Sequence, residues 1–212
     1  MFIPPAFAEN APAPLHALMR AHPLAAVVIA RDDGLDANHI PLYLDATASA
    51  AGTLRGHVAR ANPLWRACGA GIPALAIFRG PDAYITPGWY PGKRADGKAV
   101  PTWNYVTVHA HGRLRAIDDA QWLRAHLEEL VTEHEAGEAV PWKIADAPPD
   151  YIETLLRGIV GIELQITRLE GKWKASQNHP AANREGVIEG LRKRGTCAAA
   201  AMAQVVRERE PQ

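Results

Sequence analysis

The chain has 212 residues and carries 23 basic and 23 acidic side chains, so its formal net charge at pH 7 is zero. This length is sufficient for one domain with a substantial core, and the balanced charge gives no overall attraction to a polyanion such as DNA. The two cysteines, Cys68 and Cys197, lack metal-ligand spacing, which predicts a reducing, cytoplasmic setting without a disulfide framework. Neither a signal peptide nor a long uncharged apolar run stands out, so no membrane span is expected.

The first quarter of the chain predicts a short helix followed by strands. Residues 15–21 suit a helix that ends before the next proline. Residues 24–30 form a short apolar run and residues 38–44 alternate, so these two segments predict a hairpin around a turn at 32–34. A third strand is expected at 52–58.

A short helix and a second group of strands follow. Asn62 is expected to cap a helix in which Pro63 takes the first position and Cys68 lies near the end. A tight turn at Gly112 is expected to separate two strands. The strands of this group are predicted at 73–78, 83–86, 102–111 and 114–117.

The last part of the chain is predicted to be mainly helical. Apolar residues recur at helical spacing from Asp118 or Asp119 to His134, and Gly195 separates two closing helices. The other elements predicted here are a helix at 148–156, a strand from 158 up to Gly171, and the closing helices at 184–194 and 196–209.

Short strands with hairpin punctuation dominate this pattern, which predicts a mainly β protein with helices, built on an antiparallel barrel. No shift in composition marks a linker. We therefore expect residues 1–212 to form a single domain, with 180–212 as a C-terminal helical appendage.

Three polar clusters could carry chemistry, and they occupy residues 38–41, 56–63 and 171–178. In the second cluster, His57, Arg60 and Asn62 precede a helix start, and this mixture of donors suits a phosphate. The alternative, which is the more common one on residue type alone, is that Asn62 only caps its helix and Arg60 lies in solvent.

The third cluster places Lys172 and Lys174 at alternate positions, so both ammonium groups emerge on the same face of an extended segment. Ser176, Gln177 and Asn178 add neutral donors that could hold a ring carbonyl or a phosphate oxygen. The alternative is a basic surface strand that ends in a polar turn.

Other candidates for chemistry are weaker. His109 and His111 share one side of a strand, yet spacing reveals no third ligand, so no metal site is expected. The order of residues offers no Ser-His-Asp arrangement, nucleophile elbow or catalytic cysteine, which leaves enzymatic activity undecided. Three tryptophans lie beside the donor clusters and could stack on a flat heterocycle: Trp89, Trp103 and Trp173.

Taken in order, these motifs resemble the PaiB-type family of FMN-binding negative transcriptional regulators over nearly the whole chain. The segments that carry the resemblance are residues 1–7, 57–65, 80–90, 100–105 and 169–178. The resemblance implies a six-stranded antiparallel split β-barrel like that of the pyridoxamine-phosphate oxidases, with peripheral and C-terminal helices. It also implies a homodimer with FMN in a cleft between the subunits.

The cofactor residues follow from the resemblance by position in the fold. One group would edge the isoalloxazine and hold the phosphate: His39, Ile40, Pro41, His57, Val58, Ala59, Arg60 and Asn62. A second group would arrive from the partner subunit or line the outer mouth: Lys172, Lys174, Ser176 and Gln177. Family members commonly have Ser where Thr86 or Gly88 stands and Arg where His179 stands, which implies a weaker anion contact after Asn178.

Three functions therefore compete. The first is a homodimeric FMN-binding protein of the regulatory type, and the second is an FMN-dependent oxidoreductase acting on an unknown small molecule. The third is a direct DNA-binding repressor. The basic segments 184–194 and 196–209 and the name of the family favour it, but the overall charge does not.

Overall fold

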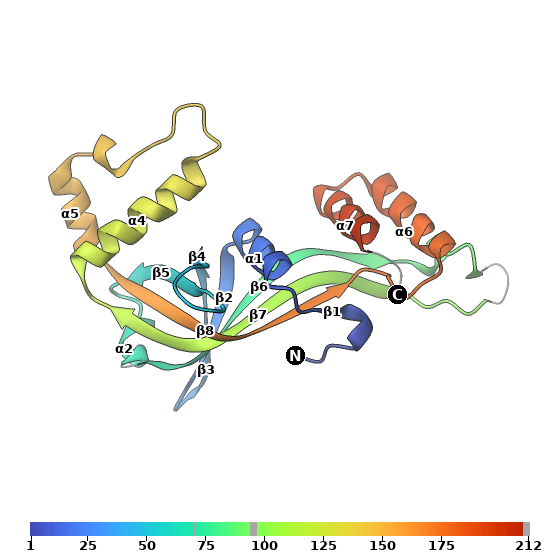
Figure 1. The fold of residues 1–212 in the computed structure, drawn as a ribbon, viewed down its shortest axis with the longest axis horizontal. Helices are drawn as coiled ribbons and strands as arrows, with labels where there is room; N and C mark the ends of the chain where they lie inside the picture. Colours follow the sequence, from blue (N-terminus) through green and yellow to red (C-terminus); the bar gives the residue numbers. More distant parts are fainter. Residues whose placement is uncertain (70, 94–96, 210–212) are drawn as a thin grey trace. The chain divides into compact units, whose positions relative to one another are not determined.

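The structure is a computed structural model that describes residues 1–69, 71–93 and 97–209. By its internal contacts the chain divides into two compact units. Unit 1 comprises Met1–Ala21, Phe78–His109 and Glu170–Gln212, and unit 2 comprises His22–Ile77 and Ala110–Leu169. Figure 1 colours both units along the chain.

An antiparallel sheet provides the framework, and eight strands rather than the predicted six are found in the described residues. Hydrogen-bonded neighbours follow the order β3-β2-β6-β7-β8-β5-β4, and β1 pairs with β8. The mainly β prediction is thus confirmed. The strands are β1 Ala8–Glu9, β2 Leu24–Arg31, β3 Gly34–Pro41, β4 Tyr43–Asp45, β5 Thr53–Ala59, β6 Ile72–Ile85, β7 Thr102–Ile117 and β8 Ile159–Lys174.

Two predicted strand pairs are single long strands, and in β7 the glycine that suggested a turn serves close packing instead. The turn predicted at Gly112 is wrong, since β7 is continuous from Thr102 to Ile117. A Cβ atom at Gly112 would lie 2.2 Å from the backbone oxygen of Gln165, so only glycine allows the neighbouring backbone to approach. Likewise, β6 joins the strands expected at 73–78 and 83–86.

Unit 2 is built on the hairpin of β2 and β3, which turns at Asp32 and Asp33, and Gly34, the first residue of β3, has a φ of 132°. Its helices are α2 Leu64–Cys68, α4 Ala120–Glu135 and α5 Pro149–Arg157, with the 3-10 turn η3 Ile144–Asp146. The predicted cap of α4 is confirmed, because Asp119 accepts a hydrogen bond of 2.7 Å from the backbone N–H of Trp122. The core of the unit includes Val27, Ile29, Leu54, Ile162 and Leu164.

Unit 1 contains the closing helices α6 Ala181–Arg194 and α7 Cys197–Glu208, together with α1 Pro12–Ala21 and the 3-10 turns η1 Pro5–Phe7 and η2 Pro87–Trp89. Gly195 adopts the left-handed conformation that ends α6, as its spacing predicted. A Cβ atom at Gly190 would lie 2.2 Å from the ring of Trp89, so this glycine lets α6 pack directly on η2.

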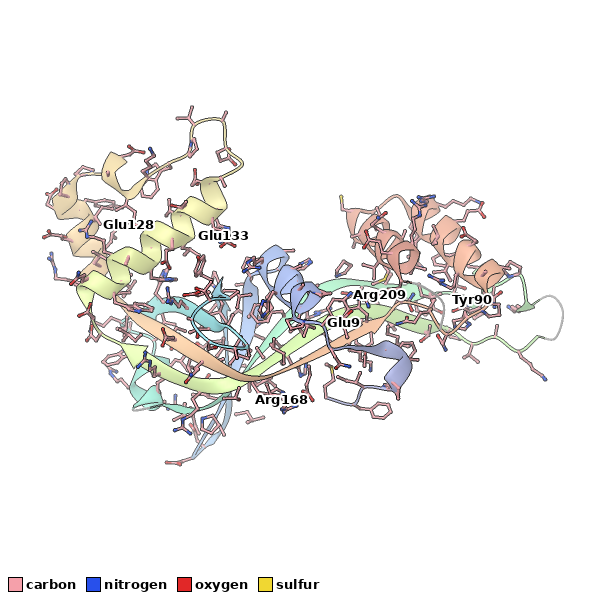
Figure 2. All side chains as sticks on the ribbon, viewed as in Figure 1. Glu9, Tyr90, Glu128, Glu133, Arg168 and Arg209 are labelled. Atoms are coloured by element: carbon pink, nitrogen blue, oxygen red, sulfur yellow. The ribbon has the colours of Figure 1, made fainter. Side chains whose placement is uncertain are left out.

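The end of α7 is fixed to the beginning of the chain in unit 1. Arg209 forms an ion pair of 2.7 Å with Glu9, both labelled in Figure 2, and its guanidinium lies 4.8 Å from the ring centre of Trp173. The appendage predicted for 180–212 therefore packs within unit 1 as far as the described residues extend, and residues 210–212 lie outside them. Across the described residues, no helix combines the length and apolar character needed to cross a bilayer.

Candidate functional site

The first two predicted clusters lie side by side in unit 2. The Asn62 amide donates a hydrogen bond of 2.8 Å to Asn38 Oδ1, which connects the loop after β5 to β3. A Cβ atom at Gly56 would lie 3.1 Å from the carbonyl oxygen of Pro41, so glycine permits the close approach. Residues that the sequence could only place separately are therefore neighbours.

Asn62 and Arg60 are both already engaged. Asn62 Oδ1 accepts a hydrogen bond of 2.9 Å from the backbone N–H of Leu64, as a capping residue does, although α2 begins at Leu64 rather than at Pro63. Arg60 donates to both oxygens of Asp118, at 2.8 Å and 2.6 Å, and to two backbone carbonyls. This hydrogen-bonded pairing raises the pKa of Arg60 and lowers the pKa of Asp118.

His57 packs toward α4. Its ring lies edge-on to the ring of His126, with 5.7 Å between the ring centres, and the His126 ring stacks on Trp122, with 5.3 Å between the ring centres. His57 Nδ1 and both ring nitrogens of His126 are buried and find no hydrogen-bond partner among the described residues. Burial lowers the pKa of His57, and burial together with nearby charge lowers the pKa of His126 to about 4. Both rings are therefore neutral at pH 7.

One face of the β2–β3 hairpin is apolar and is left partly exposed by the described residues, and we call it the open face. In register, Leu24 faces Pro41, Ala26 faces His39, Val28 faces Ala37, and Ala30 faces Leu35. Leu24 is 60% exposed and Leu35 is 81% exposed, whereas the alternate residues Val27 and Ile29 are buried. None of the eight open-face residues is an acid, a lysine or an arginine, and the face includes two of the predicted cofactor residues, His39 and Pro41.

The remaining predicted residues of unit 2 are apolar. Ile40 and Val58 are buried in the core, and Ala59 is exposed at the end of β5. Any contact that these three make with a ligand would use backbone groups or van der Waals contact.

In unit 1, two of the predicted residues hold the N-terminal segment. The ammonium of Lys172 donates to the carbonyl oxygen of Phe2 at 3.1 Å and lies 5.1 Å from the ring centre of Tyr105. The Gln177 amide donates to the carbonyl oxygens of Ala6 and Trp173 at 3.0 Å and 2.6 Å. Both side chains are buried, at 8% and 4% exposure, so their observed contacts are structural.

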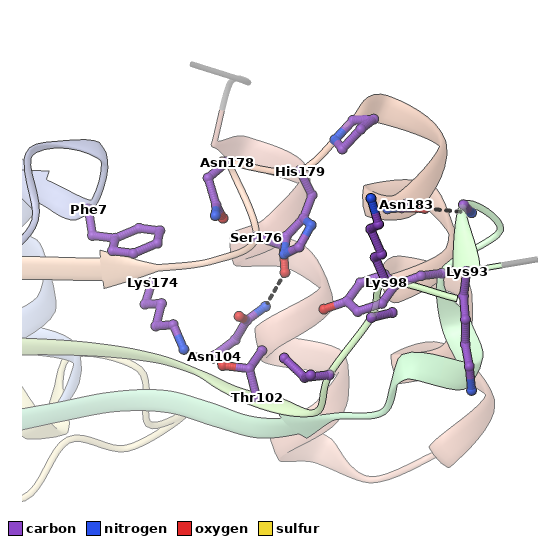
Figure 3. Close-up of a pocket in the computed structure, with 15 residues that line it drawn as sticks. Phe7, Lys93, Lys98, Thr102, Asn104, Lys174, Ser176, Asn178, His179 and Asn183 are labelled. Atoms are coloured by element: carbon purple, nitrogen blue, oxygen red, sulfur yellow. Dashed lines mark hydrogen bonds between the residues drawn. The ribbon is translucent and has the colours of Figure 1, made fainter. Parts of the chain in front are cut away.

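The other two predicted residues, Lys174 and Ser176, line a pocket of about 490 Å³ in unit 1, drawn in Figure 3. We call it the basic pocket. Lys174 donates to Thr102 Oγ1 and, at 2.9 Å, to the carbonyl oxygen of Trp103. Ser176 accepts a hydrogen bond of 2.8 Å from the Asn104 amide. The polar lining side chains are Tyr90, Lys93, Lys98, Thr102, Asn104, Lys174, Ser176, Asn178, His179 and Asn183.

Burial changes the acid–base properties of three groups in the basic pocket. Burial lowers the pKa of Lys174 and raises the pKa of Tyr90. The pKa of His179 is lowered by burial and also by the nearby positive charge of Lys174. The rings of Tyr90 and His179 stack at 4.9 Å. The Tyr90 hydroxyl is buried and finds no hydrogen-bond partner among the described residues. A wall with an unpaired donor and with Lys174, whose hydrogen-bond partners among the described residues are neutral oxygens, is suited to an anion.

The sequence did not single out Tyr90, and it considered His179 only as a departure from the family pattern. A tyrosine that follows Pro-Gly-Trp shows no hint of burial in the sequence, and only the packing of η2 makes it part of a wall. The predicted role of the tryptophans as stacking surfaces remains a prediction. In the structure Trp103 is 54% exposed and lies edge-on to Tyr84 at 6.1 Å, whereas Trp173 is buried.

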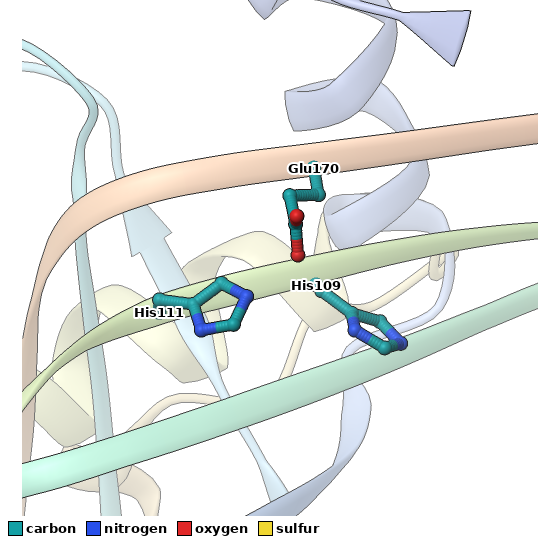
Figure 4. Close-up of side chains that lie close together, drawn as sticks. All are labelled: His109, His111 and Glu170. Atoms are coloured by element: carbon teal, nitrogen blue, oxygen red, sulfur yellow. The ribbon is translucent and has the colours of Figure 1, made fainter. Parts of the chain in front are cut away.

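A carboxylate accompanies one of the two strand histidines. In unit 1, a ring nitrogen of His109 on β7 and a carboxylate oxygen of Glu170 on β8 lie within 4.8 Å of each other, and Figure 4 draws them with His111, the next residue but one on β7. Glu170 also binds the N-terminal ammonium of Met1 at 3.2 Å. The sequence did not reveal Glu170, because only strand pairing brings it beside His109.

Comparison with known proteins adds a family match and several relatives. Residues 1–168 match the family model described as "Putative FMN-binding domain". An uncharacterized protein of Emericella nidulans, AN0679, is 35% identical over 99% of this chain and 97% of its own length. The Bacillus subtilis protease synthase and sporulation protein PAI 2 is 31% identical over 74% of this chain and 72% of its own length.

Solved structures share the fold. The FAD and heme binding protein from Mycobacterium smegmatis superimposes with a TM-score of 0.58 at 18% identity, over 79% of this chain and 73% of that protein. The flavocytochrome Anf3 from Azotobacter vinelandii gives a TM-score of 0.61 at 16% identity, over 79% of this chain and 69% of that protein. The predicted split-barrel class is thereby confirmed.

Proposed function

We propose, on the premise that this chain belongs to the FMN-binding domain family matched by residues 1–168, that it works as a homodimer whose flavin lies where a second copy covers the open face. The resemblance to the PaiB-type family is confirmed by the same match and by the Bacillus relative, and the cofactor of the family is FMN. The proposal concerns the assembly, the place of the flavin and the use that the protein makes of it.

The open face is the observation that carries the proposal. It aligns eight residues in register on two strands, without an acid, a lysine or an arginine, and leaves leucine side chains at both ends in solvent. An apolar sheet face is stabilised when another apolar layer covers it. A second copy provides such a layer, because a two-fold interface pairs the same patch with itself.

The open face also suits a flat ring. His39 and Pro41 are exposed on it, and His39 offers a nitrogen that could bind the polar edge of an isoalloxazine. We place the phosphate at the neighbouring segment from His57 to Asn62, which comprises the end of β5 and the residues that follow it. Arg60 would contribute its charge there while keeping Asp118 as a partner, and Asn62 would keep the loop against β3.

FMN supplies redox chemistry at its isoalloxazine ring when it is bound. The chain's own contribution in this proposal is to orient the ring on an apolar surface and to exclude water from one side of it. The four predicted residues of unit 1, from Lys172 to Gln177, remain predictions as flavin contacts. Two of them, Lys172 and Gln177, have structural contacts in unit 1 already.

For the use of the flavin we propose regulation of the PaiB type, without direct DNA reading by α6. The support is the resemblance together with the contacts of three of the four cations on α6, the fourth being the exposed Arg192. Arg184 is buried and donates to the carbonyl oxygen of Val206, Lys193 pairs with Glu189, and Arg194 lies 4.5 Å from the ring centre of Trp89. Cations engaged in this way favour a helix that packs in its own unit over one that binds phosphates.

The assembly is tested by substituting Ala37, which is exposed in the centre of the open face. We expect size-exclusion chromatography with light scattering to give twice the chain mass for the wild type and the single mass for Ala37→Arg. Ala136→Arg places the same side chain at an exposed site after α4 and should remain dimeric. A monomeric wild type, or a dimeric Ala37→Arg protein, would refute the proposed interface.

Flavin binding is tested on the same proteins. The purified wild type should quench the fluorescence of added FMN and keep a flavin spectrum after desalting, and His39→Ala and Ala37→Arg should both bind FMN more weakly. If His39→Ala binds FMN as tightly as the wild type does, the ring does not lie on the open face. Anaerobic reduction of the bound flavin by NADH or NADPH would favour the oxidoreductase alternative over regulation.

A further inference from the structure

We propose that the basic pocket of unit 1 binds a small organic anion with two negative charges, of the phosphate monoester or dicarboxylate class, as a second ligand beside FMN. The pocket lies within a single unit. Its lining residues come from η1, the chain between η2 and β7, the start of β7, the end of β8, the segment after β8, and α6. The inference rests on the lining residues of the pocket and, in one respect, on the proposed function, namely that the flavin lies at the open face and not in this pocket.

The charge of the lining is one-sided. Three lysines line the pocket, Lys93, Lys98 and Lys174, and no aspartate or glutamate is among its described lining residues. The contacts of the Lys174 ammonium in the described chain are the neutral oxygens of Thr102 and Trp103, so no described carboxylate neutralises it. A half-buried cation in this situation is stabilised by an incoming anion.

An unpaired donor adds a second, independent observation. Tyr90 is 4% exposed and lines the pocket, and its buried hydroxyl has no hydrogen-bond acceptor among the described residues. Buried polar groups normally find a partner, so an orphaned one beside a cavity indicates that a ligand or a water supplies it. Burial keeps this phenol protonated at neutral pH, and it is therefore available as a donor.

The neutral donors are held in place before any ligand arrives. Ser176 has a φ of 60°, a left-handed conformation that is unfavourable for a side chain other than glycine. The buried Asn104 amide donates to Ser176 Oγ, which leaves the serine hydroxyl hydrogen free to be donated. The strained residue and its tether both line the pocket, as Figure 3 shows. Such strain is typical of residues that position a ligand.

The size and the apolar wall define the class of ligand. A volume of about 490 Å³ is in the range of small-molecule sites. Phe7, Val100 and Pro180 provide apolar surface, and the stacked rings of Tyr90 and His179 provide a flat wall. An inorganic ion would leave these surfaces without contact, so the ligand should carry a carbon framework as well as its charges.

The test uses phenyl phosphate as the probe and the purified full chain saturated with FMN. Titration calorimetry should detect binding of phenyl phosphate that weakens as salt is added, and no binding of phenol, which lacks the charge. Lys174→Gln should weaken phenyl phosphate binding by roughly tenfold or more, since it removes a charged hydrogen bond. Lys193→Gln is the matched control, because this lysine is exposed in the same unit and outside the pocket, and it should not alter the affinity.

Three results would overturn the inference. Phenyl phosphate that does not bind, or that binds equally well to Lys174→Gln protein with an unchanged melting temperature, removes the anion site. Binding to FMN-free protein that is lost on saturation with FMN assigns the pocket to the flavin phosphate instead of a second ligand. A monomeric or flavin-free wild type would refute the proposed function, but it would not change the expected effect of Lys174→Gln.

Discussion

Buried polar atoms without a partner occur in both units, and their surroundings differ. In unit 2, the His57 ring lies edge-on to His126 and the His126 ring stacks on Trp122, so the unpaired nitrogens are buried beside aromatic rings. In unit 1, the unpaired Tyr90 hydroxyl belongs to the wall of a pocket that also contains Lys174 and His179. An unpaired buried polar atom therefore has different consequences in the two units.

An enclosed polar atom affects stability, whereas a polar atom beside a cavity can be satisfied by a ligand. The histidine pair avoids most of the penalty by staying neutral, because burial lowers the pKa of both rings. The tyrosine cannot avoid it in that way, since a phenol is neutral already. Substitutions that act on stability in unit 2 and on binding in unit 1 would establish this contrast.

The largest expected effect is the acid sensitivity that His126 confers. Its pKa falls from an ordinary value of 6.5 to about 4 in the folded chain, so the unfolded chain binds the proton first as the pH decreases. The stabilisation is therefore complete above pH 6.5 and is lost as the pH falls toward 4, by up to about 3 kcal/mol. Urea denaturation at several pH values measures this slope.

His126→Phe is the variant that isolates this effect. It keeps an aromatic ring against Trp122 but cannot take up a proton, so the free energy of unfolding should depend less on pH over the same interval. His134→Phe, at the exposed end of the same helix, should leave the slope as in the wild type. An unchanged slope in His126→Phe would mean that other groups cause the acid sensitivity.

A smaller effect is expected at the tether of the basic pocket. Asn104→Ala removes the donor to Ser176 and leaves a small gap at a buried site, which should lower the free energy of unfolding by about 1–2 kcal/mol. It should also weaken phenyl phosphate binding, because Ser176 is no longer held. Asn10→Ala, at an exposed site of unit 1, should alter neither quantity. A loss of stability without a loss of binding would show that Ser176 does not contribute to binding of the ligand.

Much of the fold followed from local patterns. The capping aspartate of α4, the left-handed Gly195 and the hairpin of β2 and β3 were predictable, because each depends on a few neighbouring residues. The continuity of β7 was not, since Gly112 looks the same whether it forms a turn or admits the backbone of Gln165. That choice is decided by a strand distant in the sequence.

The candidate site shows the same division. Residue types predicted donors at Asn62 and Lys174, and both lie among polar partners. Their partners came from elsewhere in the chain, as with Asp118 for Arg60 and Asn104 for Ser176, so the sequence could not tell an engaged donor from an available one. Tyr90 entered the pocket wall through tertiary packing alone.

The smallest effect on stability, and the sharpest test of the contrast, is expected for Tyr90→Phe. The change removes only the unpaired hydroxyl, so the free energy of unfolding should stay within about 1 kcal/mol of the wild type or rise. The affinity for phenyl phosphate should nevertheless fall by about fivefold, since the ligand loses a donor of ordinary strength. Thermal unfolding and calorimetry on the same sample measure both. If Tyr90→Phe lost several kcal/mol of stability while its affinity for phenyl phosphate stayed constant, the hydroxyl would have a structural partner. The buried polar atoms of both units would then affect stability and not binding.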